Sequence, residues 1–176
     1  MQLSELVVPA YAQMLGNLAG QLDKADAHIR EQGSSFEALL GRRLASDMFP
    51  LEAQIRFCCL QAGEVVHRLL ASTPPQVAEI GSLAQAHERI EEARGWLAGA
   101  DRERLDAASD RPLELALANG ITFDMTGGSY VRDWAVPQFH FHLVTAYAIM
   151  RHAGVRLGKP DYVPHMLAYL RGGDAP

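Results

Sequence analysis

Long basic runs and long apolar segments are both missing from this sequence. The 16 lysines and arginines are scattered along the chain, and the 21 acidic residues leave a formal net charge of -5. Because binding to nucleic acid or to anionic lipid depends on clustered positive charge, we expect neither partner. The apolar stretches are too short to cross a bilayer, and the N-terminus has no basic region followed by an apolar run. We therefore expect neither a membrane span nor a signal peptide.

Cysteine is scarce, and the motifs of several enzyme classes are absent. The two cysteines, Cys58 and Cys59, are neighbours. Side chains of adjacent helical residues point about 100° apart, so the pair cannot readily form a disulfide. We expect both thiols to be reduced, which predicts a cytoplasmic protein. The sequence has no CxxC spacing, no Gly-x-Ser-x-Gly pattern, no P-loop and no dinucleotide fingerprint, and hence no complete catalytic motif.

The composition that remains is that of a globular protein. The chain has 176 residues, of which 48% are hydrophobic. This length suits one domain with a single core. We predict one domain over residues 1–170 and a frayed tail over residues 171–176.

Apolar residues at steps of three and four predict a protein built from long helices. In the first segment the stripe runs through Val7, Tyr11, Met14, Leu18, Leu22, Ala25 and Ile29, which is one face of a helix. The predicted helices cover residues 4–32, 36–44, 50–72, 82–98 and 137–152. Ser4, Asp47 and Ser82 are the expected caps, and Pro137 is expected to begin the last helix. Four of these helices are long and joined by short connections, which favours an antiparallel four-helix bundle.

Residues 113–126 carry a different pattern. Their apolar residues alternate on either side of Asn119-Gly120, which predicts a β-hairpin. Ser129 is then expected to cap a short helical turn that ends near Trp134. The predicted fold class is all-α, an antiparallel four-helix bundle with a small β-hairpin between its third and fourth long helices.

Histidine 142 is the main candidate for chemistry. It falls on the expected inner stripe of the last helix, with Phe139, Leu143, Ala146 and Met150. A buried imidazole must find a hydrogen-bond partner because an unpaired one is costly. Two interpretations remain open: a structural hydrogen bond to a neighbouring helix, or a ligand-binding or proton-transfer role in a cavity of the bundle.

Three other polar residues could converge on His142. Gln54 interrupts the apolar stripe of the second long helix, Asp47 precedes that helix, and Tyr147 lies at the edge of the inner stripe of the last helix. These residues meet if the start of the second long helix packs against the last one. Asp47, Gln54, His142 and Tyr147 form the candidate pocket, although Asp47 also fits an N-cap and Gln54 a boundary residue that hydrogen-bonds to another helix.

The histidine spacing argues against a preformed metal site. Two ligands on one helix face need a separation of three or four residues. Thr145 and Ala146 occupy those positions after His142, and His140 points away from it. We therefore expect no resident metal, and a divalent metal ion is the disfavoured alternative.

Two segments resemble an uncharacterised bacterial family of unknown function. These are DMFPLxxQ from Asp47 to Gln54 and FHxxTAYxxxRxxGVxLGKxD from Phe141 to Asp161. The family is placed in the DinB/YfiT-like superfamily of four-helix bundles, and the resemblance covers nearly the whole chain. It implies an up-down-down-up bundle, a cavity near the start of the second long helix and the last helix, and frequent dimers.

The resemblance also implies a site that this sequence does not complete. Many superfamily members carry a three-histidine metal site, with two of the histidines four residues apart on the last helix, and some resemble thiol-dependent transferases or hydrolases. Here His142 alone matches, because Ala146 stands in the place of its partner and no histidine lies between Asp47 and Gln54.

Three functions stay open from the sequence. The first is a metal-free bundle that binds a small ligand or serves as a structural homodimer. The second is a divergent DinB-like transferase or hydrolase, dependent on a metal or a thiol, that uses His142. The third is a module that binds a protein partner. The incomplete metal triad and the missing nucleophile favour the first.

Overall fold

The computed structural model describes residues 2–172, so most of the expected tail, residues 173–176, lies outside the described residues. The four long helices are α1 (Leu3–Glu31), α3 (Leu51–Leu69), α4 (Leu83–Ala98) and α7 (Val136–His152). The shorter elements are α2 (Phe36–Leu40), α5 (Arg102–Ala107), β1 (Pro112–Ala116), β2 (Thr122–Thr126), α6 (Gly127–Tyr130), the π-helical turn Val131–Ala135, α8 (Lys159–Tyr162) and the 3-10 turn Pro164–Tyr169. No helix among the described residues is long and apolar enough to span a membrane.

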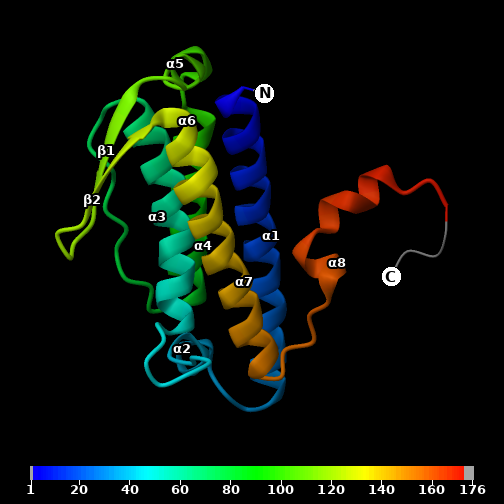
Figure 1. The fold of residues 1–176 in the computed structure, drawn as a ribbon. Coiled ribbons are helices and arrows are strands. Elements are labelled where there is room, and N and C mark those ends of the chain that lie inside the picture. The colour runs from blue at the N-terminus through cyan, green and yellow to red at the C-terminus, as the bar shows by residue number, and fades with distance from the viewer. Residues whose placement is uncertain (1, 173–176) are drawn as a thin grey trace.

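The four long helices form the predicted bundle, with a small hairpin beside it (Figure 1). α1 and α7 run in one direction and α3 and α4 in the other, which is the up-down-down-up arrangement. His87 near the start of α4 pairs with Asp23 late in α1, so these two helices are antiparallel neighbours. α3 and α7 are likewise antiparallel, and α3 packs against both α4 and α7.

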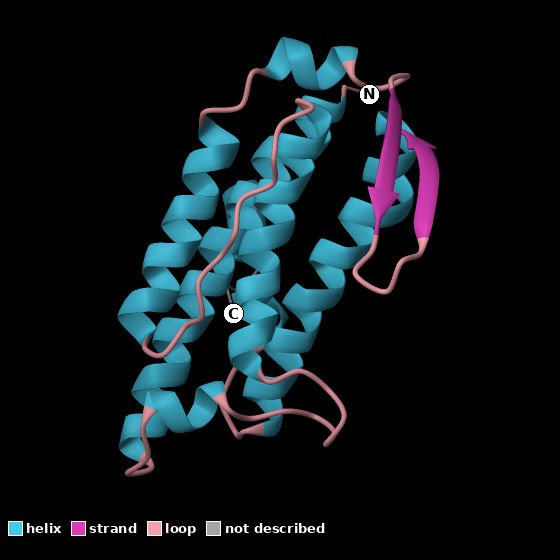
Figure 2. Cartoon of the chain, turned by 90° about the vertical axis from the view of Figure 1, so that its left-hand side faces the viewer, coloured by secondary structure: helices cyan, strands magenta, loops and turns pink. Residues whose placement is uncertain are grey.

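The connection between α3 and α4 is long, contrary to the short loop expected. Residues 70–82 run back along the bundle without helix, so α3 and α4 lie parallel (Figure 2). Glu52 Oε1, in the first turn of α3, accepts a hydrogen bond from the backbone of Ile80 at 3.1 Å. Midway along, Gly63 leaves room for this segment, because a Cβ there would lie 2.4 Å from Pro75 and 2.7 Å from Trp96.

Two predicted helix caps are wrong. α1 begins at Leu3, and Ser4 lies in its first turn, where its backbone N–H and hydroxyl both donate to Asp106 at 2.8 and 2.9 Å. The carboxylate of α5 thus satisfies an orphan N–H of α1 that Ser4 was expected to satisfy. Asp47 is exposed, and Pro50 occupies the cap position of α3 without a side-chain hydrogen bond. Ser82 does cap α4, by accepting from Gln85 at 3.2 Å.

The last helix begins earlier than predicted. Helical structure is continuous from residue 127 to 152, so Pro137 lies within it rather than at its start. The widened π-helical turn just before Pro137 fits a residue that has no N–H and whose ring crowds the preceding turn. Thr126 caps this helix, while Ser129, the expected cap, is its third residue and completes a capping box.

The hairpin has the predicted position, and its two faces differ. β1 and β2 pair antiparallel, with Leu113 opposite Met125 and Leu115 opposite Phe123. The left-handed backbone of Gly120, with φ of 84°, closes the loop. Leu113 and Leu115 are buried, so β1 joins the hairpin to the bundle.

Candidate functional site

Gln54 lies in the first turn of α3 and is almost fully buried, with 2% of its surface exposed. Its amide Nε2 donates to the backbone carbonyl of Phe49 at 3.2 Å. Because the nitrogen is engaged on that side, the carbonyl oxygen Oε1 turns toward α7. The loop before α3 thus fixes the orientation of this amide.

His142 of α7 forms a hydrogen bond with this amide oxygen. Its Nδ1 lies 2.8 Å from Gln54 Oε1. An amide oxygen only accepts hydrogen bonds, so Nδ1 carries the proton and donates it. In the neutral ring the lone pair is then on Nε2. Burial lowers the pKa of His142 from 6.5 to about 4, which keeps the ring neutral at pH 7.

His142 lies at the seam between α3 and α7, and it is half-buried rather than inside the bundle. The other members of its predicted stripe, Phe139, Leu143, Ala146 and Met150, are buried. The imidazole differs because it reaches sideways to Gln54. This hydrogen bond therefore links α3 to α7 through two residues that are 88 positions apart in the sequence.

Aromatic rings surround this histidine and continue onto the surface. The ring centroid of Phe57 lies 4.8 Å from that of His142, and the ring centroid of Phe141 lies 5.3 Å from it. Phe49 continues the row, 5.2 Å from Phe57. We call Phe49, Phe57, Phe141 and His142 the aromatic patch.

The aromatic patch is open to solvent over much of its area. Phe49 is 61% exposed and Phe141 56%. Apolar side chains that are exposed and contiguous are typical of a surface that contacts another molecule. These phenylalanines are not among the candidate residues that the sequence pattern predicts. One feature of the sequence does predict the position of Phe57: it follows Gln54 by three residues and so shares its helix face.

The structure does not bring all four predicted residues together. Tyr147 is separate from the Gln54–His142 pair, and its hydroxyl donates to the carbonyl of Leu157 at 3.4 Å. It lines a shallow pocket of about 190 Å³ with Val144, Lys159 and Tyr162. Asp47 is exposed in the loop before α3. Gln54 and His142 are thus the two predicted residues in contact, and their functional role stays a prediction.

The residues around His142 do not form a metal-binding set. Within residues 2–172, no three His, Cys, Asp or Glu side chains are grouped closely enough to hold a metal ion. His140 lies on the opposite flank of α7, with Nδ1 3.5 Å from the hydroxyl of Tyr162. Ala146, one turn after His142, is fully buried. Cys58 and Cys59 are free, and burial raises the pKa of both thiols, so neither is an activated nucleophile.

Comparisons with known proteins identify the family and the fold of the chain. Residues 3–163 match the model of the family described as a domain of unknown function, DUF1993. No curated protein matches the chain. The crystal structure of a DinB family member protein from Shewanella denitrificans is similar over 99% of this chain and 96% of that one, with 31% identity and a TM-score of 0.83. The chain therefore belongs to the DUF1993 family and has the DinB-like bundle fold.

Proposed function

We propose that this protein is a metal-free bundle that pairs with a second copy of itself through the aromatic patch. The observation that carries the proposal is the exposure of Phe49 and Phe141, which Phe57 and His142 join into one surface across the start of α3 and α7. A two-fold interface uses the same patch on both partners. Facing copies would remove these side chains from water, which is the main favourable term in association.

The hydrogen bond between Gln54 and His142 gives this surface a defined shape. It holds the imidazole against Phe57 and Phe141 and leaves Nε2 as an acceptor within the patch. A single polar group inside an apolar interface favours one register over others because misplaced copies leave it unpaired. In this proposal His142 serves recognition.

The C-terminal turn offers further apolar surface. Met166, Leu167, Tyr169 and Leu170 are all exposed, and no charged residue lies between Pro164 and Leu170. In Figure 1 this turn extends away from the four long helices. Such a segment gains stability when a neighbouring chain covers it.

The test is the molar mass in solution. Light scattering at micromolar concentration should give twice the 19.3 kDa mass of one chain. Phe141→Glu, which places a charge in the patch, should give the monomer while the helical circular-dichroism signal is kept. Gln13→Glu is the matched control, because Gln13 is exposed on α1, away from the patch, and it should remain dimeric. A monomeric wild-type chain, or a dimeric Phe141→Glu variant, contradicts this interface.

One observation favours a second candidate, a divergent DinB-like transferase or hydrolase that uses His142. Its neutral ring has an unprotonated Nε2, which is the state required of a metal ligand or a general base. Stoichiometric zinc or nickel in the purified protein, lost in His142→Gln, would support this candidate over the metal-free bundle.

The remaining features of the proposal concern setting and partners. We place the protein in the cytoplasm, because its two cysteines are free and buried, as in a reducing compartment. We propose a small molecule or another protein as the alternative occupant of the patch, and no nucleic acid, because the net charge is -5. A wild-type monomer whose patch captures another protein would identify it as a partner module.

A further inference from the structure

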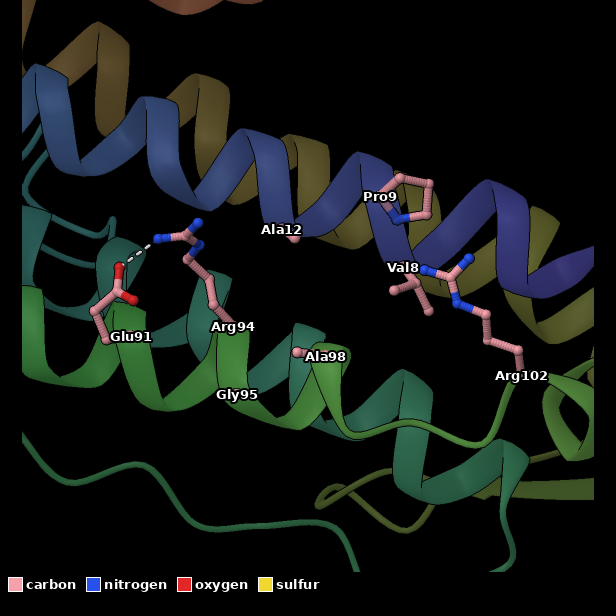
Figure 3. A pocket seen from close by; sticks show the side chains of 8 residues that line it. All are labelled: Val8, Pro9, Ala12, Glu91, Arg94, Gly95, Ala98 and Arg102. Atoms are coloured by element: carbon pink, nitrogen blue, oxygen red, sulfur yellow. Dashed lines mark hydrogen bonds and ion pairs between the residues drawn. The ribbon is translucent and has the colours of Figure 1, made fainter.

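A groove of about 450 Å³ lies between α1 and α4, on a different side of the bundle from the aromatic patch (Figure 3). Val8, Pro9 and Ala12 line it from α1, and Gly95 and Ala98 line it from α4. The groove exists because these side chains are small. A Cβ added to Gly95 would meet no atom within 4 Å, so this space is not filled by neighbouring side chains.

Two arginines lie at opposite ends of this groove. Figure 3 shows Arg94 of α4 near one end and Arg102 of α5 near the other. Arg94 Nη1 donates to Glu91 at 2.5 Å. Its Nη2 makes no hydrogen bond to a described residue, and the side chain of Arg94 is 43% exposed. Figure 3 marks no partner for Arg102 among the residues drawn. The groove thus presents two guanidinium groups with unused donors.

We propose that this groove binds an elongated dicarboxylate. One carboxylate would pair with Arg94, the other with Arg102, and the methylene chain between them would lie on Val8, Ala12 and Ala98. Guanidinium groups bind carboxylates through two parallel N–H donors. The volume is in the range of small-molecule sites, about 300 to 1,000 Å³.

The charges in the groove fit this ligand. Glu91 uses one N–H of Nη1 of Arg94, which leaves Nη2 and the second N–H of Nη1 for an incoming carboxylate. The ligand carboxylate would therefore accept hydrogen bonds from the free donors of Arg94 while Glu91 keeps its own. A compact anion such as phosphate meets only one of the two guanidinium groups, so the length of the ligand is the recognised feature.

Calorimetry with a graded set of ligands tests the proposal. Wild-type protein is titrated at low ionic strength with the α,ω-dicarboxylates from succinate to suberate, and with hexanoate and 1,6-hexanediol as singly charged and neutral controls. One chain length should bind best, and hexanoate at least about tenfold more weakly, because it loses one ion pair. The absence of dicarboxylate binding below about 10 mM overturns the proposal.

Matched variants locate the binding site. Arg102→Gln should weaken the best ligand at least about tenfold, while Arg104→Gln, which removes the same charge from the same helix, should leave it unchanged. Gly95→Leu should fill the groove and abolish binding, whereas Gly20→Leu, also with open space around its Cβ, should not. Equal effects of the two arginine variants, or normal binding by Gly95→Leu, contradict the groove. None of these results depends on the dimer.

Discussion

Lowering the pH should destabilise this protein through His142. The pKa of this ring is about 4 in the folded protein, below its ordinary value of 6.5. The unfolded chain therefore binds the proton more tightly, and stability falls as the pH drops from 6.5 toward 4. Between pH 7 and pH 5 the difference in proton affinity corresponds to about 2 kcal/mol of the free energy of unfolding.

The structure explains why protonation is unfavourable here. Gln54 Oε1 already accepts from Nδ1, and that bond persists in the imidazolium. The cost arises at Nε2, because a proton there places a charge among Phe57 and Phe141. Burial is the cause of the lowered pKa, and no described carboxylate is hydrogen-bonded to the ring to offset it.

Urea denaturation at pH 7, 6 and 5 measures this effect. His142→Gln removes the titrating group, so its loss of stability between pH 7 and pH 5 should be smaller than that of the wild type by about 2 kcal/mol. Other groups, such as the partly buried His140, titrate equally in both proteins and cancel in the difference. His152→Gln, an exposed position at the end of the same helix, is the control. Parallel pH profiles for wild type and His142→Gln would refute the reasoning.

Three further variants test the packing of the bundle by thermal or urea denaturation. Tyr11→Phe should stabilise the protein by about 1 kcal/mol, because the buried Tyr11 hydroxyl has no hydrogen-bond partner within residues 2–172; a loss of stability would reveal a partner for it. Gly63→Ala should destabilise by about 1–2 kcal/mol, since its methyl group would overlap Pro75 and Trp96 and the gain in helix propensity offsets only part of that. Asp106→Ala should lower the free energy of unfolding by about 1 kcal/mol, because it leaves the Ser4 N–H in the first turn of α1 without its acceptor. An unchanged unfolding midpoint would contradict this capping role.

The long helices were predictable because their apolar residues repeat at helical spacing. The stripe of α1 from Val7 to Ile29 is buried as the pattern required. The hairpin was predictable for a similarly local reason, the alternation around Asn119-Gly120. These signals lie within one segment and need no knowledge of its neighbours.

The features that the sequence did not reveal are long-range. The cap of α1 comes from Asp106, 102 residues away. The course of residues 70–82 is determined by what they pack on, namely Gly63 and the start of α3. No local pattern distinguishes such a segment from a loop that projects into solvent.

The candidate site was predictable in part. Gln54 and His142 each stand out as polar residues on apolar stripes, and each needs a partner. Their contact was expected only on condition that α3 and α7 pack together, which the structure shows. Asp47 and Tyr147 were grouped with them by proximity in sequence to the same helices. Asp47 lies exposed in the loop before α3, and Tyr147 leaves α7 on another face, where its hydroxyl meets Leu157, so neither joins the pair.

The return of the chain along the bundle between α3 and α4 has a consequence for folding speed. Helices that follow each other directly in an up-down bundle can pair as local hairpins. Here α4 pairs antiparallel with α1, joining residues 64 apart, and α3 pairs with α7, joining residues 88 apart. Closing loops of this length costs chain entropy before the contacts of either helix pair can form. Refolding should therefore be slower than for an up-down bundle of equal size.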